Sequence, residues 1–128
     1  MAGLSPFERF GGAPAVAAVV DAFYDLVDSD PAYSELRRMH GADLTPTRHA
    51  LTAFLSGWMG GPRDWFDQNP GKCMISLHAA LPITARAAGQ WVHAMRAAIA
   101  SCGIEPELAS RLGDVFDDLA KRMTRLSA

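Results

Sequence analysis

The stretch Cys73–Trp91, CMISLHAALPITARAAGQW, places a histidine in a short apolar segment and a tryptophan thirteen residues later on an expected helix. The imidazole of His78 can bind a metal or a haem iron through one ring nitrogen while a hydrogen bond holds the other. The indole N–H of Trp91 is a donor only. Taken singly, each residue is more often part of a packed core. The stretch therefore predicts a site only if the rest of the chain supports one.

Length and charge restrict the class of protein. A chain of 128 residues predicts one domain, 1–128, that can bury a sufficient core without disulfides or a cofactor. The net charge of −2, with acids and bases scattered, argues against nucleic-acid binding and against a polybasic membrane surface. No signal-like start or membrane-spanning apolar run occurs, and Cys73 and Cys102 read as reduced thiols. We expect a soluble, cytoplasmic protein.

Apolar residues recur at helical spacing along most of the chain, and no period-two strand pattern occurs. Thr45 is the expected N-cap of one helix and Thr84 of another, with Pro46 in the first turn after Thr45. Tyr24 lies at the edge of an apolar stripe, and this pattern alone favours a rim residue with its hydroxyl in water. Helices are expected over 5–9, 14–27, 31–38, 45–59, 84–102 and 105–126, with a loop over 63–72. The fold class is all-α.

Several chemical motifs are missing from the sequence. It contains no phosphate-binding G-x-x-x-x-G-K-[ST] loop, no H-E-x-x-H helix, no C-x-x-C pair and no G-x-S-x-G elbow. His40 and His49 are nine residues apart, a spacing that would point them in different directions on one helix. A metal site of local histidines and unaided acid–base or nucleophilic catalysis are therefore not supported.

The order and spacing of five landmarks together resemble a truncated haemoglobin, and most of all the second group of that family. The landmarks are Gly11-Gly12, Phe23-Tyr24, the stretch FLSGWMGGP over Phe54–Pro62, the spacing from Trp65 to His78, and Gln90-Trp91. The resemblance implies a globin-like two-over-two sandwich, helices B and E on helices G and H, with a loop-rich F region. It also implies haem b between the layers.

The same resemblance implies roles for individual residues. His78 matches the proximal haem ligand, and Tyr24, Trp91 and Thr47 match distal positions that face a bound gas. His40 matches the residue at the corner before helix E, where it is a further candidate donor to the gas, with Met39 as the competing assignment. The implied haem contacts are His78, Phe23, Leu51, Phe54, Leu55, Met74, Leu77, Leu81, Trp91 and Met95. Many relatives carry an arginine where this chain has Leu77, which leaves Arg63 and Lys72 as substitutes near the haem propionates.

Three functions are compatible with such a site. The first is reversible binding of O₂, at a histidine-ligated iron with hydrogen bonds from Tyr24 and Trp91, and NO and CO are the other expected ligands. The second is haem redox chemistry, as an NO dioxygenase or a peroxidase-like enzyme, which needs a reductase partner that the sequence does not name. The third is a haem-free helical interaction module. A homodimer is compatible with each.

Overall fold

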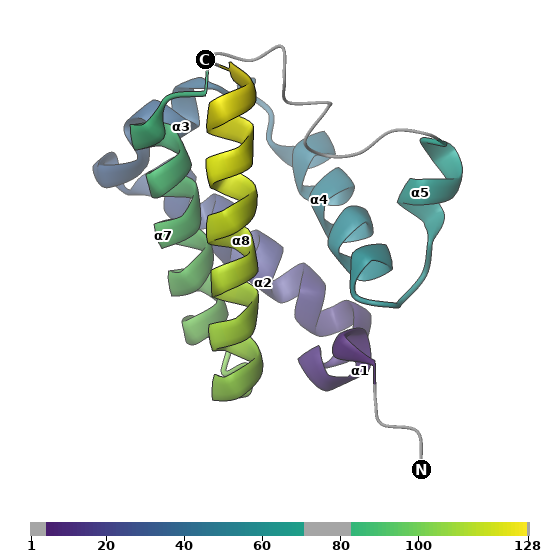
Figure 1. Cartoon of the computed structure of the whole chain (residues 1–128). Helices are drawn as coiled ribbons and strands as arrows, with labels where there is room; N and C mark the ends of the chain where they lie inside the picture. Colours follow the sequence, from purple (N-terminus) through teal and green to yellow (C-terminus); the bar gives the residue numbers. More distant parts are fainter. Residues whose placement is uncertain (1–4, 71–82, 128) are drawn as a thin grey trace.

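The computed structural model describes residues 5–70 and 83–127 (Figure 1), without the side chains of Met123 and 125–127. Every regular element in these ranges is a helix, so the all-α prediction is confirmed there. The elements are α1 (Pro6–Phe10), α2 (Gly12–Ser29), the 3₁₀ turn η1 (Pro31–Tyr33), α3 (Ser34–Arg38), α4 (Thr45–Trp58), α5 (Asp64–Gln68), α7 (Ala85–Ser101) and α8 (Pro106–Ser127). None of the described helices is long and apolar enough to cross a membrane.

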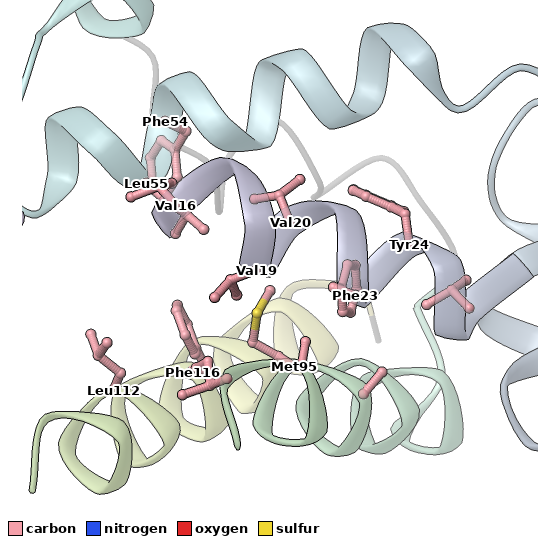
Figure 2. Packing of buried hydrophobic residues seen from close by; sticks show 14 of the residues in the cluster. Val16, Val19, Val20, Phe23, Tyr24, Phe54, Leu55, Met95, Leu112 and Phe116 are labelled. Atoms are coloured by element: carbon pink, nitrogen blue, oxygen red, sulfur yellow. The ribbon is translucent and has the colours of Figure 1, made fainter. Parts of the chain in front are cut away.

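The long helices form two layers. Helices α7 and α8 lie side by side in one layer, and α2 packs both on α7 and on α4 in the other (Figure 1). Helix α2 is central because its apolar positions recur every three or four residues and therefore meet both neighbours. Val16, Val20 and Phe23 are fully buried there, and Met95 of α7 faces them across the core (Figure 2). Burying a side chain of this size contributes about 1.5–3 kcal/mol.

Most helix boundaries follow local signals. Gly11 adopts a φ of 120° between α1 and α2, where a side chain would be strained, so the double glycine ends the first helix as expected. Thr84 caps α7 by accepting the Ala87 N–H at 3.0 Å. The prediction that Thr45 is the N-cap of α4 is wrong. Thr45 is already helical, and Asp43 accepts the Thr45 N–H at 3.0 Å, because an aspartate can bond to the backbone two residues later.

The prediction of a loop over 63–72 is wrong for part of that range. Residues Asp64–Gln68 form the short helix α5, and Trp65 within it is buried. The ring of Trp65 lies 5.1 Å from that of Phe54 on α4, and the ring of Phe66 lies 5.6 Å from it. A five-residue helix is not stable alone. Its loop-like composition is overridden by the packing of these two aromatic rings on α4.

Candidate functional site

A cavity of about 420 Å³ lies between the two helical layers. It is bounded by α2, the α3 corner, α4, α7 and α8, and its walls are mostly apolar. The lining residues are Tyr24, Leu36, Met39, His40, Pro46, Thr47, Ala50, Leu51, Ile83, Ala87, Ala88, Trp91 and Ala120. Its volume lies in the range of about 300–1,000 Å³ that is typical of small-molecule and cofactor sites.

Five residues that the sequence analysis singled out line this cavity. They come from four separate parts of the chain and are Tyr24, His40, Thr47, Leu51 and Trp91. Met39 lines the cavity as well, so the two competing assignments at the corner, Met39 and His40, both face it.

Other predicted haem contacts lie behind the lining or outside the described chain. Phe23, Phe54, Leu55 and Met95 are buried in the core and are not lining residues. Phe23 supports the lining indirectly, since its ring contacts Tyr24 edge-on at 4.7 Å and Trp91 at 6.4 Å. Four predicted contacts fall outside the described residues, namely Met74, Leu77, His78 and Leu81.

Tyr24 is buried, with 4% of its surface exposed, so its interpretation as a rim residue is wrong. The stripe on α2 is wider than one face because α4 and α7 cover the helix from two sides. Burial raises the pKa of the Tyr24 phenol, and the charge of Arg48, 5.7 Å above the ring, lowers it slightly. Among the described residues, none forms a hydrogen bond with the Tyr24 hydroxyl. Tyr24 therefore offers the cavity an O–H donor that keeps its proton at neutral pH.

Trp91 lies half-buried on the other side of the cavity, on α7. Its indole is held between two phenylalanine rings, edge-on to Phe23 at 6.4 Å and to Phe116 at 5.5 Å. Such edge contacts stabilise a ring in one orientation by about 0.5–1.5 kcal/mol each. The cavity thus combines two aromatic side chains that can donate, an O–H and an N–H, with apolar walls.

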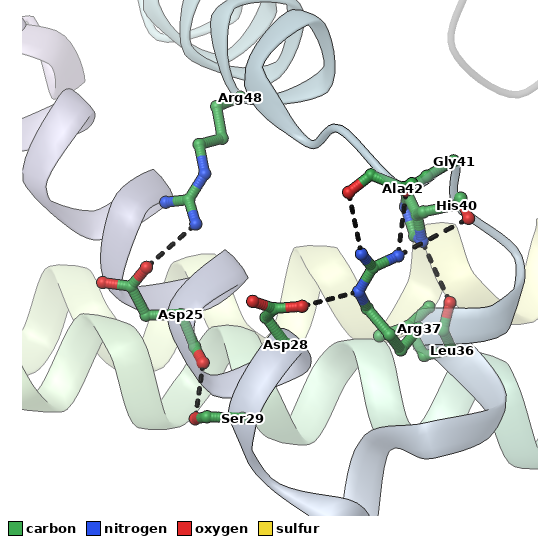
Figure 3. A network of polar contacts seen from close by, with 9 residues as sticks. All are labelled: Asp25, Asp28, Ser29, Leu36, Arg37, His40, Gly41, Ala42 and Arg48. Carbon is green, nitrogen blue, oxygen red and sulfur yellow. Dashed lines mark hydrogen bonds and ion pairs between the residues drawn. The ribbon is translucent and has the colours of Figure 1, made fainter.

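His40 reaches the cavity from the α3 corner, which polar contacts hold in place (Figure 3). Its Nδ1 lies 2.9 Å from the carbonyl oxygen of Leu36, and its ring stands edge-on to Tyr24 at 5.8 Å. Arg37 stiffens the same corner by donating to the Gly41 carbonyl at 3.0 Å and pairing with Asp28 at 2.8 Å. The corner is therefore anchored both to its own backbone and to α2.

Several lining residues were not singled out from the sequence. Ala87 and Ala88 precede Trp91 by one helical turn, so helix spacing could have placed them on the same face. Ala50 follows Thr47 by three residues on α4, so the same spacing could have placed it, and Pro46 precedes Ala50 by four. Ala120 has no such signal, since only the packing of α8 brings it to the cavity.

The remaining polar candidates lie away from the cavity. His49 is exposed, and His93 bonds the Tyr33 hydroxyl at 2.7 Å. Arg63 stacks on the Phe66 ring at 4.7 Å and is not a lining residue, while Lys72 falls outside the described residues. Within 5–70 and 83–127, no cluster of three His, Cys, Asp or Glu side chains could hold a metal ion.

Comparisons with known proteins give consistent matches. The family model described as "Bacterial-like globin" matches residues 5–125. The Group 2 truncated hemoglobin YjbI of Bacillus subtilis is 29% identical over 119 residues, which are 93% of this chain and 87% of that protein. A cold-adapted truncated hemoglobin from Pseudoalteromonas haloplanktis has a TM-score of 0.89 at 28% identity, covering 94% of this chain and 97% of that chain.

A second solved structure supports the fold alone. The Group II 2-on-2 hemoglobin from Agrobacterium tumefaciens has a TM-score of 0.91 at 24% identity and covers 96% of this chain and 95% of that chain. Together with the packing of α2 on α4 and on α7, and of α7 on α8, this similarity confirms the two-over-two helical sandwich.

Proposed function

This chain belongs to the bacterial-like globin family, and we propose that its cavity holds haem b and binds O₂ reversibly. Membership of the truncated globins implies haem-based gas binding, which is the general function. The finer proposal concerns the iron ligand, the residues that contact the gas, and the choice of O₂. One observation carries it: two aromatic donors, Tyr24 and Trp91, line a mostly apolar cavity of about 420 Å³.

The cavity suits a haem by size and by chemistry. Its walls are mainly alanine, leucine and aromatic carbon, which match the apolar edge of a porphyrin. Haem iron, when bound, would supply the reversible binding of a diatomic gas. We assign the ligand role to His78 by the resemblance alone.

The side chains of the cavity would act on the bound gas by hydrogen bonding. A bound O₂ would accept hydrogen bonds more readily than CO would. The Tyr24 O–H and the Trp91 N–H are donors with apolar surroundings, where water competes poorly. Each bond would contribute about 1–3 kcal/mol, equivalent to roughly five- to a hundredfold in the rate of gas release. Thr47 lies on α4 at the same cavity and could add a weaker contact.

An absorption spectrum tests the haem. The purified protein is measured as isolated, after reduction, and after reduction under CO, beside the variants His78→Ala and His49→Ala. We expect a sharp haem band that shifts with CO and is altered only by His78→Ala, because His49 is exposed. A protein that stays colourless after haem is added would refute the proposal and favour a haem-free helical module.

The rate of O₂ release tests Trp91. Trp91→Phe keeps an aromatic ring and removes the N–H, so O₂ should dissociate roughly five- to a hundredfold faster in stopped-flow measurements. Trp58→Phe is the matched control, since Trp58 is 38% exposed and is not a lining residue. An unchanged rate in Trp91→Phe would remove this residue from the role.

A further inference from the structure

A side chain of α7 is bonded to the backbone of the α3 corner. Gln90, half-buried beside Trp91, accepts the Leu36 N–H with its Oε1 at 3.1 Å, across 54 positions of sequence. Leu36 is in the first turn of α3, where backbone N–H groups have no acceptor within the helix. Gln90 therefore acts as a cap supplied from another helix.

The carbonyl of the same residue bears on which ring nitrogen of His40 carries the proton. The Leu36 oxygen lies 2.9 Å from His40 Nδ1 and accepts the Met39 N–H at 3.1 Å. A carbonyl oxygen only accepts hydrogen bonds, so the proton of this contact belongs to Nδ1. A neutral imidazole carries one proton, and Nε2 is then an acceptor.

We propose that Gln90 is a positioning residue of the cavity: through both backbone groups of Leu36 it holds His40 in the Nδ1–H form. In the neutral ring, Nε2 of His40 then accepts a hydrogen bond and does not donate one. Where the proposed function holds, the donors to O₂ are then Tyr24 and Trp91, and His40 is not a third. The resemblance by itself had placed His40 among the residues that stabilise the gas.

The dependence on Gln90 follows from the size of α3. A helix of five residues cannot hold its own hydrogen bonds in water, so its geometry comes from contacts with other elements. Gln90 makes one such contact at the Leu36 peptide itself. The Tyr33 hydroxyl makes a second, to His93 of α7 at 2.7 Å, without touching Leu36. Tyr33→Phe therefore loosens the same junction but leaves the Leu36 peptide bonded, which makes it the matched control.

Nitrogen NMR of the histidine rings tests the proposal. The full-length protein, with labelled histidine, is reduced under CO and studied at about pH 8, above the ordinary histidine pKa of about 6.5. The His40 signals are assigned with His40→Gln. We expect the Nδ1–H form in the unmodified protein. In Gln90→Met, the ratio of Nε2–H to Nδ1–H should rise by roughly two- to tenfold, with a similar rise in the hydrogen-exchange rate of the Leu36 amide.

Conservative variants separate positioning from a general loss of structure. Gln90→Glu keeps an oxygen acceptor of the same reach and should retain the ratio of the unmodified protein, as should Tyr33→Phe. The Nε2–H form in the unmodified protein would overturn the proposal without any variant, and so would an unchanged ratio in folded Gln90→Met. The ring measurement does not need gas binding, so a colourless protein would refute the proposed function and leave this test in place.

Discussion

Tyr24→Phe removes one hydroxyl from the cavity. It should leave the free energy of unfolding nearly unchanged and speed the release of O₂. The ring stays, so the packing of Tyr24 against Phe23 at 4.7 Å is kept. The hydroxyl has no hydrogen bond to a described residue, so its removal breaks none of the contacts that hold the fold. The residue is 4% exposed and lines the cavity, so the lost group is one that faces the cavity.

The magnitudes follow from that environment. We expect the free energy of unfolding to change by less than about 1 kcal/mol, since the lost hydroxyl faces the cavity and bonds none of the described residues. The rate of O₂ release should rise by roughly five- to a hundredfold, since a donor to the gas is lost.

Tyr33→Phe is the matched control, because Tyr24 and Tyr33 are the only two tyrosines of the chain. The Tyr33 hydroxyl bonds His93 at 2.7 Å and is not at the cavity. This variant should lose about 0.5–1.5 kcal/mol of stability and release O₂ at the original rate.

Urea unfolding followed by circular dichroism and stopped-flow O₂ release give the two readings for each tyrosine variant. The reasoning is refuted if Tyr24→Phe loses more than about 1 kcal/mol, or if its release rate equals that of the unmodified protein.

Two further predictions concern pH and glycine. Burial raises the pKa of both Tyr24 and Tyr33, so the native state holds these protons more tightly than the unfolded chain does. The corresponding stability is complete below about pH 10, the ordinary tyrosine pKa, and falls as pH rises above it. Urea unfolding at about pH 9 and about pH 11 should show this fall, and an equally steep fall in Tyr24→Phe would contradict it. Gly89→Ala should stabilise by about 1 kcal/mol, since nothing lies within 4 Å of the added carbon inside α7. Gly57→Ala should destabilise by about 1–3 kcal/mol, because that carbon would lie 2.7 Å from the Phe66 ring, and similar melting temperatures for the two variants would show that this packing is wrong.

The helices were largely predictable because their signals are local. Apolar spacing along α2 and α8 and the cap at Thr84 depend on residues within a few positions of one another. The errors came where a distant contact outweighed a local signal. Helix α5 forms in a stretch of loop-like composition because its aromatic rings pack on Phe54.

The candidate site, too, could be predicted in part. The resemblance indicated Tyr24, His40, Thr47, Leu51 and Trp91, and all five line one cavity, although their roles stay predictions.

The sequence by itself determined the fold class, the long helices and the N-cap of α7, since periodicity and capping act within a few residues. The tertiary structure alone decided that Tyr24 is buried, that Ala120 of α8 closes the cavity, and that Gln90 bonds the Leu36 peptide. Each of these depends on which helices lie against each other. That choice is made by the burial of whole faces together, so no single stretch of sequence contains it.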